Sequence, residues 1–312
     1  MRLDRWFKQR FPGIGHARLQ KLVRTGQIRV DGARAKAGTR LEPGQKVRIP
    51  PLGPLPVAKP GRAQPAVSDA DARDLKARVL HRDNEVIVLD KPAGLAVQGG
   101  SGTRRHIDAM LDALRFGSGD RPRLVHRLDK DTSGVLVIAR NAAAARELTA
   151  GFRNKKARKL YWAVVTGVPN QDEGIIDLAL AKMSGRGGEK VTAGKKGGKS
   201  ALTHYRVIDR AGAKAAWVAF EPETGRTHQL RVHAVALGTP ILGDGKYGGK
   251  EAFIKGEDIA SRLHLHARAI QIPHPAGGIL KVSAPLPDHM RVTFDMLGFD
   301  ASAEKKIFFE LF

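Results

Sequence analysis

The sequence LVHRLDKDTSG, residues 124–134, leads directly into the apolar run VLVIA, residues 135–139. The apolar run predicts a buried strand, and a loop whose end is fixed by such a strand is a usual place for site residues. Asp131, which precedes Thr-Ser-Gly, is typical of a turn closed by side-chain-to-backbone hydrogen bonds. Asp129 is a candidate site carboxylate. Its alternative is a salt bridge with a neighbouring basic side chain, Arg127 or Lys130.

A second informative run is EPETGRTHQLRVH, residues 221–233. Its pattern predicts a helix over Thr227–Leu237, with Thr227 as the N-terminal cap. Arg231 then lies near the helix start, where its charge opposes the helix dipole and favours a bound anion. Asp129 is one candidate for that anion, and a phosphate is another. The alternative is an ordinary arginine on the protein surface.

Two shorter runs complete the set. RKLYWA, residues 158–163, predicts a strand in which Tyr161 points to one face and its two neighbours point to the other. A tyrosine on a sheet is most often half-buried core. Because the chain has only 3 tyrosines and this one follows two basic residues, stacking on a nucleic-acid base is the alternative. KPAG, residues 91–94, follows an apolar run and indicates a structural turn.

The first 50 residues predict a small α+β module. Helical patterns span Leu3–Phe11 and His16–Thr25, and strand patterns follow at residues 28–30 and 47–49. The second helix carries a basic side chain at every third position, which is either a solvated face or a phosphate-binding stripe. The phosphate-binding interpretation is favoured because this segment is the most basic of the chain. The stripe consists of Arg18, Lys21 and Arg24.

The net charge of the chain is +23, with 54 Lys and Arg against 31 Asp and Glu. Such an excess repels itself in a compact fold and points to a polyanionic partner, the alternative being general basicity kept for solubility. Residues 1–60 hold 14 of the basic residues and 3 of the acidic ones. Nearly half of the excess therefore lies in this segment, which favours a dedicated nucleic-acid-binding region.

Several classes of protein and site are excluded or disfavoured. No run approaches the ~20 apolar residues of a membrane-spanning helix, and the first residues lack the apolar core of a signal peptide. The absence of cysteine excludes disulfides, thiol catalysis and cysteine zinc sites. His264 and His266 alternate in a predicted strand, where a structural or partly exposed role is expected rather than metal binding. We expect a cytoplasmic protein without a metal site.

The chain is expected to divide into a basic, nucleic-acid-binding module at residues 1–50, a proline-rich linker at 51–74, a larger second domain at 75–298 and a tail at 299–312. The second domain mixes short strands with scattered helices, which predicts an α+β fold with a mixed, mostly antiparallel sheet. The Gly- and Lys-rich stretch 184–199 is a candidate RNA-contacting loop. Predicted strands are Val86–Leu89, Val135–Ala139, Leu160–Val165, Trp217–Phe220 and Ala269–Ile272, and predicted helices are Ala142–Phe152 and Thr227–Leu237.

The order of these runs, KPAG, HRLDKDTSG, KLYWA and TGRTHQLRVH, closely resembles that of the RluA-type pseudouridine synthase family. Three further runs agree: GTPILGDGKYG at 238–248, LHLHA at 263–267 and SAPLP at 283–287. The resemblance covers residues 82–298. Residues 19–32, LQKLVRTGQIRVDG, resemble the ribosomal-protein-S-four-like RNA-binding module. Together they are similar to the bacterial branch that modifies large-subunit ribosomal RNA.

The resemblance implies a role for each matching residue. Asp129 matches the catalytic aspartate, and Arg127 matches an arginine that contacts RNA and helps to expel the target nucleotide. Tyr161 matches the tyrosine that packs against the target base. Leu230 matches an apolar wall of the pocket, and Arg231 matches the arginine that pairs with the catalytic aspartate.

Pseudouridine formation breaks the bond between ribose and a uracil nitrogen and rejoins the base through a ring carbon, so it requires no cofactor. A carboxylate can act at the anomeric carbon, as in glycosidases, or as a base at the ribose. Either route needs an ionised Asp129, which a paired Arg231 favours. Ribosomal RNA is the expected partner and a monomer the expected state. A non-catalytic RNA-binding factor and an enzyme acting on transfer RNA are the alternatives.

Overall fold

The N-terminal unit of the computed structural model, Met1–Ala66, combines two helices with a small sheet. Its core uses the positions that predicted the helices, including Phe7 of the first and Leu19 of the second. Asp31 and Gly32 both have positive φ, 48° and 79°, and form the predicted turn between two strands. The elements are α1 (Leu3–Arg10), α2 (His16–Arg24), β1 (Arg29–Val30), β2 (Ala33–Arg34) and β3 (Val47–Arg48), in the sheet order β2-β1-β3.

The C-terminal unit, Val67–Phe312, is built on a sheet with the strand order β4-β5-β7-β14-β8-β13-β12-β9, with β15 beside β14 and β6 beside β7. Hairpin β10–β11 forms a separate sheet. The predicted α+β class with a mixed sheet is confirmed. The strands are β4 (Val79–Arg82), β5 (Val86–Lys91), β6 (Arg123–Leu124), β7 (Ser133–Ala139), β8 (Arg158–Thr166), β9 (Glu173–Asp177), β10 (Leu180–Met183), β11 (Lys190–Ala193), β12 (Leu202–Ala211), β13 (Ala215–Pro222), β14 (Leu265–Pro273) and β15 (Ile279–Ser283).

Strands β7 and β14 are parallel, whereas the other pairs within the described residues are antiparallel. Gly134 of β7 is opposite Ala267 of β14. Its φ is 103°, and an added Cβ would lie 2.2 Å from the Ala267 carbonyl oxygen, so glycine is required. Ala267 is in turn opposite Tyr161 of β8. The loop that ends at Gly134 therefore shares a cross-strand row with Tyr161.

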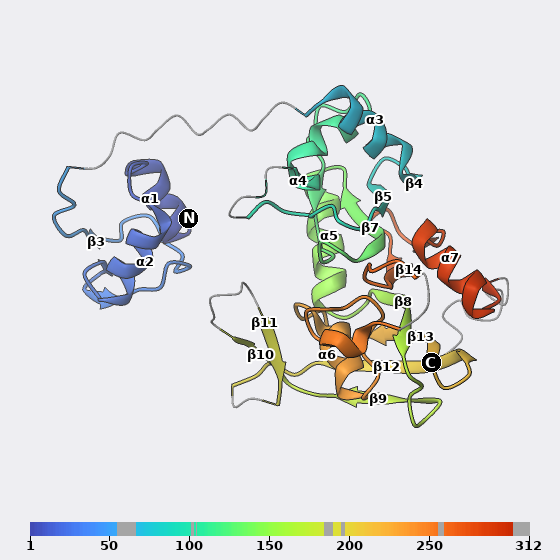
Figure 1. The fold of residues 1–312 in the computed structure, drawn as a ribbon. Helices are drawn as coiled ribbons and strands as arrows, with labels where there is room; N and C mark the ends of the chain where they lie inside the picture. The colour runs from blue at the N-terminus through green and yellow to red at the C-terminus, as the bar shows by residue number, and fades with distance from the viewer. Residues whose placement is uncertain are drawn as a thin grey trace. The chain divides into compact units, whose positions relative to one another are not determined.

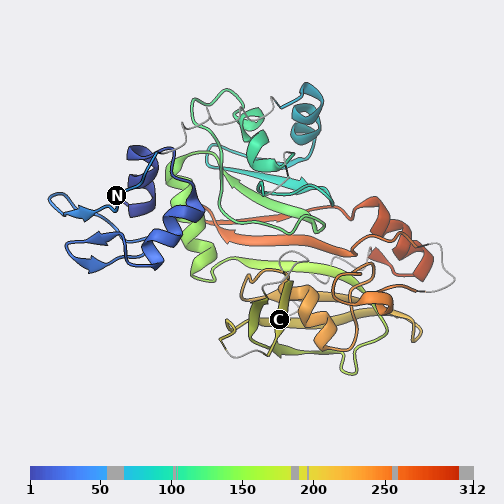
Figure 2. The same ribbon diagram turned by 60° about the vertical axis from the view of Figure 1, so that its left-hand side comes forward.

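Helices cover both faces of β8. Trp162 packs with Phe294 of α7, whereas Ala163 packs with Leu230 and Ala234 of α6, which confirms the predicted alternation. In both views α6 lies beside the hairpin β10–β11, and α7 lies apart from them (Figures 1 and 2). The helices are α3 (Asp69–Ala77), α4 (Ile107–Met110), α5 (Ala142–Arg153), α6 (Gln229–Ala236) and α7 (Asp288–Leu297), with 3-10 turns η1 (Leu111–Leu114) and η2 (Gly249–Ala252).

Some predicted boundaries need correction. The structure describes residues 1–54, 67–100, 103, 105–183, 190–194, 197–254 and 259–301. The linker predicted at 51–74 ends too late, because α3 begins at Asp69 and its Leu75 is buried in the core. Phe299, in the predicted tail, packs on the core. The tail beyond residue 301 and residues 184–189 and 195–196 of the Gly- and Lys-rich stretch lie outside the described residues. No helix in the described ranges is long and apolar enough to cross a membrane.

Candidate active site

The loop that carries Asp129 is held at both ends, because the flanking strands β6 and β7 pair with each other. Within the loop, His126 Nε2 accepts a hydrogen bond of 2.8 Å from the Val137 amide, and its ring stacks on Phe152. Leu128 is buried in the core. These contacts on either side leave Asp129 only partly exposed, with 18% of its side chain accessible.

Lys91 of the KPAG turn also holds the loop that carries Asp129. Its buried ammonium donates hydrogen bonds of 2.8 Å to the carbonyls of Pro92, Leu95 and Lys130. Burial lowers the pKa of Lys91 to about 7, although the negative charges of Asp131 and Asp129 act to raise it. The Gly94 amide also donates to the Lys130 carbonyl. These contacts agree with the structural role predicted for KPAG and fix the backbone next to Asp129.

Asp129 lies in a cleft of about 530 Å³, a size typical of ligand sites. The predicted site residues of this unit all line it: Arg127, Asp129, Tyr161, Leu230 and Arg231. A second cavity of about 570 Å³, called the side cavity here, is lined by Asp129, His228, Arg231 and Asp244 among others. Asp129 therefore lies where the two cavities adjoin.

Tyr161 extends from β8 into the cleft. Burial raises the pKa of its phenol, and the negative charge of Asp129 raises it further. The phenol therefore stays neutral near the carboxylate. Arg127 is exposed at the cleft, whereas Leu230 is buried, with 6% exposure, and provides an apolar surface.

The direct partner of Arg231 differs from the expected one. In the described part of the chain, Arg231 makes its ion pair with Asp244 rather than with Asp129, through bonds of 2.8 and 2.6 Å. Burial alone would lower the pKa of Arg231, but Asp244 outweighs it and Asp129 adds a smaller contribution, so the pKa is raised. The expectation of a direct pair with Asp129 is wrong. Arg231 acts on Asp129 only across a longer distance.

The start of α6 also differs from expectation. The helix begins at Gln229, and His228 at the cap position has a left-handed backbone with φ of 54°. Thr227 is therefore not the cap. The ring of His228 makes no cap hydrogen bond to the helix. Its Nδ1 lies 2.6 Å from the Tyr247 hydroxyl, and its Nε2 lies 3.9 Å from Asp129 Oδ2.

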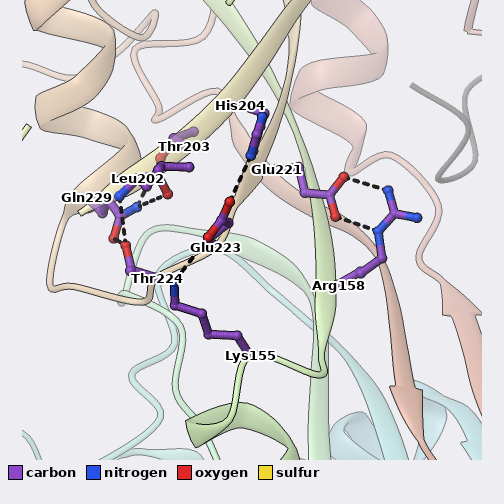
Figure 3. Close-up of polar contacts among 9 residues, drawn as sticks. All are labelled: Lys155, Arg158, Leu202, Thr203, His204, Glu221, Glu223, Thr224 and Gln229. Carbon is purple, nitrogen blue, oxygen red and sulfur yellow. Dashed lines mark hydrogen bonds and ion pairs between the residues drawn. The ribbon is translucent and has the colours of Figure 1, made fainter. Parts of the chain in front are cut away.

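Gln229 fixes this irregular entry to α6. Its amide nitrogen donates to the Leu202 carbonyl and the Thr203 hydroxyl, while its oxygen accepts from the Thr224 hydroxyl and the Arg226 amide. These four hydrogen bonds connect α6 both to β12 and to the loop before the helix. Figure 3 shows the contacts of Gln229 with Leu202, Thr203 and Thr224. The loop that carries His228 is thereby attached to the sheet.

Lys155 and Glu223 line the cleft and belong to the group of ion pairs drawn in Figure 3. Glu223 lies between His204 and Lys155, with contacts of 3.1 and 3.0 Å. Arg158 makes two hydrogen bonds to Glu221. Lys159 lines the cleft, and burial lowers its pKa to about 8. In the sequence, Lys159 was notable only as a basic neighbour of Tyr161, and its place in the cleft wall was not predicted.

In the N-terminal unit, α2 presents the predicted basic stripe on its exposed surface. Lys21 and Arg24 line a cavity of about 590 Å³ together with Arg34 and Lys36. Arg18 instead donates to the Leu52 carbonyl. Two of the three stripe residues therefore lie beside Arg34 and Lys36, two cations that the sequence pattern did not indicate.

The described residues contain no group of three or more His, Asp or Glu side chains placed to hold a metal ion. His264 and His266 are fully buried, so they are structural rather than partly exposed. Besides Lys159, three polar residues of the site escaped prediction: His228, Asp244 and Tyr247. The runs TGRTHQLRVH and GTPILGDGKYG contain them, but only tertiary contacts reveal that these runs meet.

The comparisons with known proteins agree on one family. The family model for RNA pseudouridylate synthase matches residues 85–236. The ribosomal large subunit pseudouridine synthase C of Escherichia coli O157:H7 is 36% identical over 93% of this chain and 91% of its own length. An RNA pseudouridine synthase of Zymomonas mobilis is 44% identical over 72% of this chain and 99% of its own length. The structure of human RNA pseudouridylate synthase domain containing 4 has a TM-score of 0.59 at 29% identity, covering 73% of this chain and 95% of that one.

Proposed function

Because the chain belongs to the RNA pseudouridine synthase family, it isomerises uridine in RNA, and we propose that Asp129 is its catalytic carboxylate and large-subunit ribosomal RNA its substrate. The observation that carries the assignment is the position of Asp129 where two cavities adjoin, near Tyr161, His228 and Arg231. In the loop 124–134, the neighbouring Asp131 is exposed and lines the side cavity but not the cleft, so only Asp129 of the two carboxylates lines both.

The reaction breaks the bond from C1′ of the ribose to N1 of uracil and forms a bond from C1′ to C5. The hydrogen of C5 then leaves as a proton, and N1 gains a proton. Asp129 assists in one of two ways. Its carboxylate stabilises or attacks the electron-poor C1′ as N1 leaves, or it removes a ribose proton and returns it after the base has turned. Both routes start from the ionised carboxylate and are neutral overall in protons and electrons.

The target uridine must leave the RNA stack before it can enter the cleft, which costs on the order of a few kcal/mol. We assign that step to Arg127, which is exposed at the cleft. Tyr161 then provides an aromatic surface for the base, and Leu230 an apolar one. Arg231 and Lys159 supply positive charge on the same walls.

The choice of large-subunit ribosomal RNA rests on relatives of that name that match over nearly their whole length. We further propose that the N-terminal unit is an S-four-like RNA-binding module. The cavity with Lys21, Arg24, Arg34 and Lys36 supports this, because four clustered cations suit the phosphate backbone. The enzyme is proposed to act as a monomer in the cytoplasm.

Modification mapping tests the substrate assignment. Carbodiimide labelling with primer extension is applied to ribosomal and transfer RNA from cells with and without the protein. Loss of pseudouridines from large-subunit ribosomal RNA alone is the expected result. Loss confined to transfer RNA would contradict the substrate and leave the chemistry intact.

A further inference from the structure

The backbone of His228, the residue before α6, has a left-handed conformation that is unfavourable for histidine. Its φ of 54° and ψ of 23° are left-handed, which costs a residue with a side chain about 1–2 kcal/mol. It stands at the cap position of α6 but makes no side-chain cap hydrogen bond. Such strain is often found where a side chain is aimed for function. The ring nitrogens of His228 lie near the side chains of Tyr247 and Asp129 and make no hydrogen bond that caps the helix.

The first of these side chains is Tyr247. Its hydroxyl accepts a hydrogen bond of 3.1 Å from the Val191 amide of β11 and lies 2.6 Å from His228 Nδ1. An amide can only donate, so the phenolic hydrogen is available for Nδ1. Burial raises the pKa of Tyr247, which keeps that hydrogen in place. With Nδ1 accepting, the neutral ring carries its hydrogen on Nε2.

The second side chain is Asp129. His228 Nε2 lies 3.9 Å from Asp129 Oδ2, and both side chains are mostly buried, at 14% and 18% exposure. Catalytic contacts are often long without substrate and shorten when it binds. A movement of about 1 Å brings this pair to hydrogen-bond distance. The hydrogen on Nε2 can then be donated to the carboxylate oxygen.

From this geometry we propose that His228 is a positioning residue for Asp129, held in one tautomer by Tyr247. The bond from Nε2 to Oδ2 fixes the carboxylate plane and leaves Oδ1 for the nucleotide. The proposal rests on the assignment of Asp129 as the catalytic carboxylate. It also gives the hairpin a role, because Val191 of β11 sets the direction of the Tyr247 hydroxyl. Val191 itself packs with Val232 of α6.

Kinetics of two variants test the proposal. His228→Asn suits the left-handed backbone, which asparagine tolerates better than most residues. It should lower kcat about 100-fold, because a carboxylate misplaced by about 1 Å loses that much, while KM for RNA stays near the wild-type value. Tyr247→Phe keeps the ring and should lower kcat about 10-fold. Matched controls outside the cleft are His81→Asn and Tyr205→Phe, both expected at wild-type kcat.

A spectroscopic measurement separates positioning from a purely structural role. With ¹⁵N-labelled histidine at about pH 8, where an ordinary imidazole is neutral, His228 should show hydrogen on Nε2. Tyr247→Phe should mix the two tautomers, and Tyr205→Phe should not. A mixed tautomer in the wild type would overturn the proposal, even if His228→Asn failed to fold.

Asp129→Asn, assayed alongside, separates this inference from the proposed function. If Asp129→Asn is inactive while His228→Asn turns over at the wild-type rate, the role of His228 is wrong and that of Asp129 stands. If Asp129→Asn is active, the proposed function itself fails.

Discussion

The guanidinium of Arg231 donates two hydrogen bonds to the carboxylate of Asp244, at 2.8 and 2.6 Å, with both side chains buried. The pair joins α6 to the loop that follows residue 238, and Arg231 also lies over the ring of Tyr247. Asp244 follows Gly243, where an added Cβ would lie 1.8 Å from the Arg262 carbonyl oxygen. The site is therefore built around an ion pair that neither motif reveals alone.

Removing one partner of this pair should destabilise the fold more than removing both. Asp244→Leu or Arg231→Met alone leaves a buried charge without its partner, which costs about 3–5 kcal/mol. The double variant Arg231→Met/Asp244→Leu should recover part of that loss. Urea unfolding measures the three stabilities. Single variants as stable as the wild type, or strictly additive losses, would contradict the buried pair.

Gly134→Ala should destabilise the fold by about 3 kcal/mol or more, because a Cβ would collide with the backbone of Ala267. The matched control is Gly117→Ala. Gly117 has φ of 80°, and a Cβ added there would meet no atom within 4 Å, so only the backbone penalty of about 1–2 kcal/mol applies. Thermal unfolding compares them. Equal losses in the two variants would refute the close approach of β7 and β14.

Acid should destabilise the protein through the buried His264 and His266 and the half-buried His126, which are neutral in the folded protein. Burial lowers the pKa of His126 to about 3, of His264 to about 4 and of His266 to about 3. An unfolded histidine has a pKa of about 6.5. Their stabilising contribution is therefore complete above about pH 6.5 and is lost as the pH falls toward their folded values.

His266→Gln tests this dependence, because glutamine keeps a polar side chain but does not titrate. It should reduce the slope of unfolding free energy against pH by about 1.4 kcal/mol per pH unit between about pH 6 and about pH 5. The exposed His16→Gln should leave the slope as it is. An unchanged slope in His266→Gln would show that this histidine takes up its proton in the folded state.

RNA affinity should depend on salt through the N-terminal unit. Lys21→Gln and Arg24→Gln should each lower the slope of log affinity against log salt by about 1, because each removes one phosphate contact. Arg18→Gln should have a smaller effect, since its guanidinium already donates to the Leu52 carbonyl. Filter binding at several salt concentrations measures the slopes, with Lys281→Gln as control. Slopes that match the wild type would argue against phosphate contacts at this cavity.

Much of the fold was predictable because its signals are local. Alternation placed Tyr161 and Trp162 on opposite faces of β8, and the turn pair Asp31-Gly32 predicted the first hairpin. The start of α3 was missed although Ser68 and Asp71 have the spacing of a helix cap, and Ser68 does accept from the Asp71 amide. The prolines before it favoured a linker over that signal.

The site was predictable only in part. The predicted residues from Arg127 to Arg231 do come together in one cleft. The carboxylate that pairs with Arg231 is set by how α6 packs against the loop that carries Asp244. The spacing of residues along the sequence does not show this packing, so it could not favour Asp244 over Asp129. The cap prediction at Thr227 failed for a similar reason, because Gln229 and Tyr247 hold His228 in a left-handed conformation through tertiary contacts.

The central claim, that Asp129 is the catalytic carboxylate, is tested most directly by tritium release from RNA labelled at C5 of uracil. Asp129→Asn should lower the rate of release by about 1,000-fold or more while RNA affinity stays at the wild-type value. Asp131→Asn, the neighbouring carboxylate in the same loop, should release tritium at the wild-type rate. Release by Asp129→Asn at the wild-type rate would contradict the account.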